Sequence, residues 1–147
     1  MFKDKCIKIL TDYFKKNAES YHIEAAFLFG SYAKGFIKEE SDVDIAIVFS
    51  EEIDSDEKIF DLINKINIEL DSHINAEIDI MPIYPDFRKP MLYYNAIVLG
   101  IPLYVKNKRQ YIRLQNEALF QMNDFELFGT SFQLQAAKNM LREVPHV

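Results

Sequence analysis

The chain has 147 residues, a length that suits one domain with a single hydrophobic core. Hydrophobic residues make up 49%, and with only four glycines and five prolines the collagen-like, linker-like and disordered classes are excluded. The chain carries 23 acidic against 17 basic residues, a formal net charge of −6 at pH 7, which disfavours direct nucleic-acid binding. A single cysteine excludes a disulfide-stapled scaffold, and no stretch approaches the roughly 20 apolar residues of a membrane span, so we expect a cytoplasmic protein with no membrane partner.

The first half of the chain predicts a helix followed by two buried strands. Apolar residues within 2–17, among them Cys6, recur at spacings of three and four, which is typical of an amphipathic helix. Residues 22–29 form a short apolar run that stops at Gly30, and residues 42–49 form a second such run. Short apolar runs of this length favour buried strands.

The second half predicts two further helices, two further strands and a helical tail. Residues 56–71 show one apolar helical face, and residues 76–83 alternate acidic and aliphatic side chains as a strand does. A short helix over about 89–99 is expected to end at Gly100.

A short strand over 101–105 then contains Pro102, which favours a sheet edge, and residues 107–144 are expected to be mostly helical. The whole predicts one mixed α/β domain with a C-terminal helical tail.

Two pairs of residues are the main candidates for a functional site. Asp42 and Asp44 stand two apart on a predicted strand, so their carboxylates project from the same face and can share a divalent cation such as Mg²⁺. We expect Ile45, Ile47 and Phe49 to continue that face inward. Gly30 and Ser31 follow the preceding strand, where a missing side chain and free backbone N–H groups favour an anion such as a phosphate.

A third acid completes the predicted site. Asp79 lies between two isoleucines on a predicted strand, where a carboxylate is costly without a cation, and it is a candidate metal ligand or proton acceptor. Glu77, on the same face, is the alternative. Lys34 and Ser41 are candidate nucleotide-binding residues, with a solvated loop residue and a loop cap as the alternatives.

Taken together, these residues resemble the signature of the DNA-polymerase-β-like nucleotidyltransferase superfamily, and more narrowly the minimal nucleotidyltransferase (MNT) antitoxins of HEPN/MNT toxin–antitoxin pairs. The resemblance covers residues 27–44, 78–80 and 100–104. It implies a nucleotidyltransferase fold with a mixed sheet flanked by helices. It also implies a catalytic core over residues 1–106, with residues 107–147 as a helical extension of the same compact unit.

The resemblance further implies ATP as substrate, one or two Mg²⁺ ions, and transfer of AMP to a tyrosine hydroxyl of a HEPN-type RNase toxin. By the match, Gly30 and Ser31 bind the triphosphate, Asp42 and Asp44 bind metal, and Asp79 is the third carboxylate. Two alternatives stay open. One is a small-molecule nucleotidyltransferase of the aminoglycoside-modifying kind, and the other is a non-catalytic module that neutralises a toxin by covering it.

The tail carries more apolar surface than one core face requires. Phe120, Leu127, Leu134 and Leu141 recur every seven residues beside a second apolar stripe. One interpretation is that both stripes pack on the domain. The other is that one stripe docks a partner or a second copy, giving a homo- or hetero-oligomer through the C-terminal helices.

Overall fold

The computed structural model describes residues 2–30 and 42–124. Its elements, in chain order, are α1 (Phe2–Asn17), β1 (Ile23–Phe29), β2 (Val43–Phe49), α3 (Asp56–Asp71), β3 (Ile78–Pro82), α4 (Pro90–Ile97) and β4 (Ile101–Val105). Residues 108–124 form a further helix. The predicted α/β order is confirmed, and the predicted tail stripe beyond Phe120 lies outside the described residues.

The four strands form one mixed sheet in the order β3-β2-β1-β4. Strand β1 pairs antiparallel with both β2 and β4, whereas β2 and β3 are parallel and are joined through α3. Central β1 is buried on both faces, which explains its continuous apolar run. Strand β4 lies at an edge, as Pro102 predicted.

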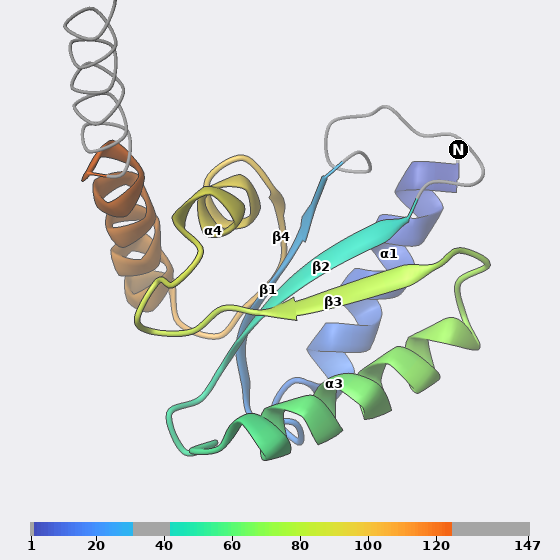
Figure 1. Cartoon of the computed structure of the whole chain (residues 1–147). Helices are drawn as coiled ribbons and strands as arrows, with labels where there is room; N and C mark the ends of the chain where they lie inside the picture. Colours follow the sequence, from blue (N-terminus) through green and yellow to red (C-terminus); the bar gives the residue numbers. More distant parts are fainter. Residues whose placement is uncertain (1, 31–41, 125–147) are drawn as a thin grey trace, which may run out of the picture.

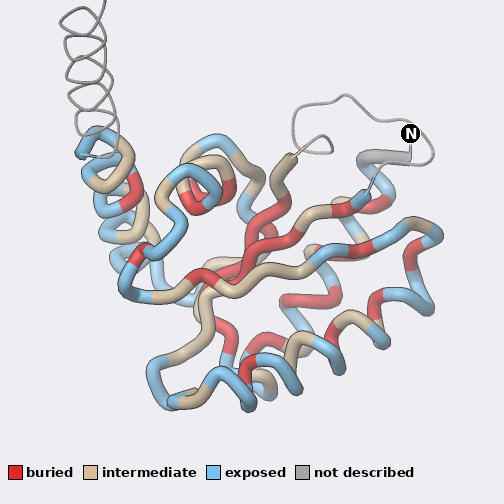
Figure 2. Tube along the Cα trace, viewed as in Figure 1, coloured by how far each residue is buried: buried red, intermediate tan, exposed pale blue. Residues whose placement is uncertain are grey.

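Helices cover both faces of the sheet (Figure 1). One hydrophobic cluster packs α1 and α3 against the sheet and includes Cys6, Phe14, Ile45 and Ile66. The other packs α4 and the helix 108–124 against the opposite face and includes Tyr93 and Ala118, among others. Figure 2 shows buried positions concentrated along the sheet and on the inner sides of these helices.

Local sequence features fix where the helices begin and end. The Ser55 hydroxyl caps α3 by accepting a hydrogen bond from the Lys58 N–H at 3.2 Å. Pro90 opens α4, where its missing N–H costs nothing. After α4, Gly100 passes so close to the carbonyls of Ala96 and Leu28 that a Cβ would overlap both. The chain can therefore turn tightly from α4 into β4.

One expectation about β2 is wrong. Ile45 and Ile47 belong to the cluster under α1 and α3, and Phe49 packs against it, whereas Ala46 belongs to the opposite cluster. Because side chains alternate along a strand, Asp44 shares its face with Ala46 and not with the isoleucines. The acids therefore face the α4 side of the sheet.

The helix 108–124 is packed onto the domain along one side. Ala118 is fully buried in the α4-side cluster, with Tyr111 and Leu114 against it. The ring of Tyr111 meets Phe27 of β1 edge to face, with centroids 5.8 Å apart. Within residues 2–30 and 42–124, no helix is both long and apolar enough to cross a membrane.

A polar contact holds α1 to α3 on the other side of the sheet. The hydroxyls of Tyr13 and Tyr21 both donate hydrogen bonds to the carboxylate of Glu69, the former at 2.7 Å. Lys65 lies over the ring of Tyr21, with its Nζ 5.2 Å from the ring centroid. Charge-assisted hydrogen bonds of this kind are stronger than neutral ones, so the carboxylate bridges the two elements.

Candidate functional site

The ends of three strands meet at one edge of the sheet. Strand β1 runs antiparallel to β2 and ends next to the start of β2, and the start of parallel β3 lies on the other side of β2. Gly30 follows β1, Asp42 precedes β2, and Asp79 lies near the start of β3. The topology thus brings together residues that are up to 49 positions apart in the chain.

Asp44 and Asp79 lie directly across from each other. They are register partners in the parallel pair β2 and β3, and Asp44 is paired with Phe29 of β1 on its other side. Paired residues on neighbouring strands point to the same face, so both carboxylates project toward the α4 side. Asp42 and Asp79 are exposed and Asp44 is half-buried. Two of the three carboxylates are therefore open to solvent, and the third lies closer to the sheet.

Gly30 lies against the carboxylate of Asp44 at this edge of the sheet. Its φ is +74°, a left-handed conformation that glycine adopts without strain. A Cβ at this position would overlap the Asp44 carboxylate. The backbone after β1 consequently passes directly beside the acid, and no residue with a side chain fits there without displacing it.

The electrostatics of the site favour the binding of a cation. Burial raises the pKa of Asp44, and the negative charges of Asp79 and Asp42 raise it further. None of the ion pairs recorded among the described residues involves these three carboxylates. A nearby positive charge would relieve both the burial penalty and the mutual repulsion.

The donor set fits Mg²⁺ bound together with a substrate. In the part of the chain that the structure describes, no three acidic, histidine or cysteine side chains already converge closely enough to hold a metal ion. Mg²⁺ commonly takes one or two carboxylates and completes its shell with water and substrate phosphates. Hard carboxylate oxygens beside a glycine turn suit that mode better than an all-protein cage.

The structure brings Gly30, Asp42, Asp44 and Asp79 to one place, as the sequence predicted. Ser31, Lys34 and Ser41 lie outside the described residues. The close approach of Gly30 to Asp44 was not foreseen. A glycine that ends an apolar run gives no indication of which distant side chain it faces, because that depends on strand pairing.

Comparison with known proteins then identifies the family. The family model described as polymerase beta, nucleotidyltransferase matches residues 8–109. The chain belongs to this nucleotidyltransferase family. The match spans every strand and the whole candidate site, so the resemblance inferred from the sequence is confirmed at this level. A comparison with curated proteins found no significant match.

Solved structures share the nucleotidyltransferase fold. A chain from a toxin–antitoxin complex with AMP-PNP is 16% identical, with a TM-score of 0.65 over 86% of this chain and 98% of that one. A chain from a Shewanella oneidensis complex of a tri-AMPylated HEPN toxin with an MNT antitoxin is 14% identical, with a TM-score of 0.62 over 89% and 98%. A MntA–HepT toxin–antitoxin complex gives 13% and 0.61 over 88% and 98%. At these identities the likeness shows a common fold.

Proposed function

We propose that this nucleotidyltransferase is an antitoxin that transfers AMP from ATP–Mg²⁺ to a tyrosine hydroxyl of a HEPN-type RNase toxin and so neutralises it. The observation that carries the proposal is the meeting of Gly30, Asp42, Asp44 and Asp79 at one sheet edge in a chain of this family. Further support comes from the fold shared with chains of toxin–antitoxin complexes, one of which contains an AMPylated HEPN toxin.

In this proposal the carboxylates bind the metal and the glycine turn binds the triphosphate. Asp42, Asp44 and Asp79 hold Mg²⁺, which supplies positive charge to the triphosphate when bound. Gly30 and Ser31 bind the triphosphate through the backbone and a hydroxyl, and Lys34 and Ser41 add contacts to the nucleotide.

The transfer itself exchanges one phosphorus–oxygen bond for another. The tyrosine oxygen forms a bond to the α-phosphorus while the bond from that phosphorus to the bridging oxygen of the β-phosphate breaks, releasing pyrophosphate. The phenolic proton passes to the Asp79 carboxylate, which lies across from Asp44 and is exposed to an incoming acceptor. We assign this chemistry to residues 1–106 and propose that residues 107–147 are a helical extension of the same unit.

The experiment combines a labelled substrate with a catalytically disabled variant. Wild-type protein and the variant Asp42→Asn/Asp44→Asn are incubated with Mg²⁺, ATP labelled on the α-phosphate, and lysate of the source organism. We expect label on a protein band with wild type only, and that band identifies the acceptor.

Two other outcomes contradict the proposal in different ways. Label in a small molecule would identify a small-molecule nucleotidyltransferase. If the double-Asn variant neutralises its partner fully, protection is steric and AMP transfer is not the basis of antitoxin action.

A further inference from the structure

The helix 108–124 has two sides of different character. Ala118 is fully buried in the cluster on the α4 side of the sheet, and Leu114 packs against the same cluster. Phe120, two residues after Ala118, is 64% exposed. Because each residue of an α-helix is rotated by about 100° from the one before, Phe120 points away from the side that holds the helix on the domain. The packing of Ala118 therefore leaves the Phe120 side of this helix available to another surface.

The sequence continues the exposed side beyond the described residues. Phe120 is the first of four apolar residues that recur every seven positions, followed by Leu127, Leu134 and Leu141. We call these four residues the heptad stripe. A strict seven-residue repeat keeps apolar side chains along the contact line of two helices that wind around each other. As an α-helix, residues 120–141 span about 33 Å, which is long enough for such a contact.

The charges along the heptad stripe indicate in which direction a second helix lies. Residues 117–130 contain three acidic residues and no basic residue, whereas residues 131–144 contain two basic residues and one acidic residue. Two copies that run in the same direction place the acidic halves against each other, which is unfavourable. Two copies that run in opposite directions place each acidic half against a basic half. The chain is therefore complementary to itself in the antiparallel orientation.

The same orientation also matches individual residues. When Phe120 of one copy lies across from Leu141 of a second copy, Leu127 lies across from Leu134 in the same register. Asp124, which is exposed at the end of the described helix, then comes within one residue of Lys138 of the second copy. Charged pairs beside the apolar line set the orientation of paired helices.

We propose that the heptad stripe is a homodimer interface on which a second copy of this chain docks in the antiparallel direction. Both copies use the same surface, so the contact closes on itself and assembly stops at the dimer. The dimer carries two candidate sites, one in each copy. The inference does not depend on AMP transfer, because no residue of the acidic sheet edge takes part in the contact.

Sedimentation equilibrium of the full chain over a wide range of concentrations tests the interface. We expect an equilibrium between monomer and dimer for the wild type. The variant Leu127→Glu/Leu134→Glu places charges on the apolar line and is expected to be monomeric at every concentration. Phe60→Glu is the control, because Phe60 is 63% exposed on α3, at the opposite face of the sheet, and this variant is expected to dimerise like the wild type.

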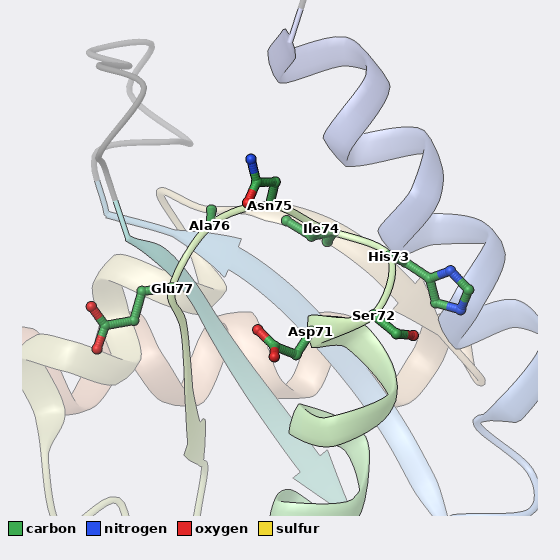
Figure 3. Close-up of a pocket in the computed structure, with 7 residues that line it drawn as sticks. All are labelled: Asp71, Ser72, His73, Ile74, Asn75, Ala76 and Glu77. Atoms are coloured by element: carbon green, nitrogen blue, oxygen red, sulfur yellow. The ribbon is translucent and has the colours of Figure 1, made fainter.

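A charge reversal tests the antiparallel orientation. Asp124→Lys is expected to raise the dissociation constant of the dimer about fivefold, since the pair with Lys138 occurs twice in each dimer. Asp124→Lys/Lys138→Asp restores the pair with its charges exchanged and is expected to return the constant to the wild-type value. Asp71→Lys is the matched control, because Asp71 is an exposed acid at the end of α3 and lines a separate depression (Figure 3).

Paired cysteines distinguish the dimer from a tail that folds back on its own helix. In Leu127→Cys/Leu134→Cys, mild oxidation is expected to join two chains, and Cys6 does not compete because it is buried. A disulfide within one chain would overturn the proposal. A wild type that stays monomeric at every concentration, or a dimer that survives Leu127→Glu/Leu134→Glu, would overturn it as well.

Discussion

Gly30 lies directly against the carboxylate of Asp44, although 14 positions separate them in the chain. The contact joins the end of β1 to the start of β2 and uses both features of glycine, its left-handed φ and its missing Cβ. It explains in physical terms why the turn before the acid pair needs a glycine, independently of any ligand.

Gly30→Ala is therefore expected to be destabilising in a way that depends on Asp44. The left-handed φ alone costs about 1–2 kcal/mol for a residue with a Cβ, and the overlap with the carboxylate adds to this. In an Asp44→Ala background the overlap is absent, so the cost should fall by at least about 0.5 kcal/mol. Urea unfolding of the four proteins measures this coupling, and strictly additive changes would show that the two residues do not touch.

Asp44→Asn is expected to stabilise the protein at neutral pH in a buffer with a metal chelator. Burial and the charges of Asp79 and Asp42 raise the pKa of Asp44, so the folded state releases this proton at a higher pH than the unfolded chain does. The folded state thus loses stability as pH rises from the unfolded pKa of about 3.9 through the raised folded value, and the loss is complete well above it.

The measurement is the melting temperature against pH. Asp44→Asn should melt higher than wild type at pH 7 and equally below about pH 3, where the carboxyl is protonated in both states. Asp61→Asn, at an exposed position of α3, is the control. A lower melting temperature for Asp44→Asn at pH 7 would contradict the account of the site as acids lacking a cation.

Glu69→Gln is expected to destabilise the protein at neutral pH, in contrast to Asp44→Asn. The hydroxyls of Tyr21 and Tyr13 donate to Glu69 and hold its pKa below the usual range. The resulting stability is present above the unfolded pKa of about 4.3 and is lost as pH falls through the lower folded pKa. The variant should lose about 1 kcal/mol of unfolding free energy at pH 7, because solvent screens this partly exposed carboxylate, and urea unfolding measures the loss. A loss of the same size at pH 2 would rule out the charge as its source.

Two neighbouring residues test how the helix 108–124 belongs to the domain. Ala118 is fully buried, whereas Leu119 is 42% exposed. Ala118→Glu places an unpaired charge in the α4-side cluster and should cost about 3 kcal/mol or more. Leu119→Glu should change the unfolding free energy by about 0.5 kcal/mol or less. Similar effects of the two variants would mean that this helix does not pack on the core in solution.

Much of the fold follows from periodicity alone. The helix 56–71 has the bounds of α3, and the buried strand runs differ from β1 and β2 by one residue at an end. The short helix expected over about 89–99 is only Pro90–Ile97 in the structure, because local pattern fixes the type of an element better than its limits.

The sheet order and the facing of side chains required the structure. Ile45 and Ile47 alternate with Asp44, so they belong to the other face, and the expectation that they continue the acid face was a miscount of the strand period. The bridge from Tyr13 and Tyr21 to Glu69 joins residues 48 and 56 positions apart, and nothing in their local sequence indicates it. Likewise, only the parallel register of β2 and β3 shows that Asp79 lies across from Asp44.

The central claim is that Asp42, Asp44 and Asp79 catalyse the transfer of AMP to an acceptor. ATP labelled at one of two different phosphates tests this claim most directly. Purified protein, Mg²⁺ and the acceptor are incubated with ATP labelled on either the α- or the γ-phosphate. The account predicts α-label on an acceptor tyrosine, γ-label only in released pyrophosphate, and neither transfer with Asp42→Asn/Asp44→Asn. Transfer of γ-label to the acceptor, or α-label transfer that survives in the double variant, would contradict it.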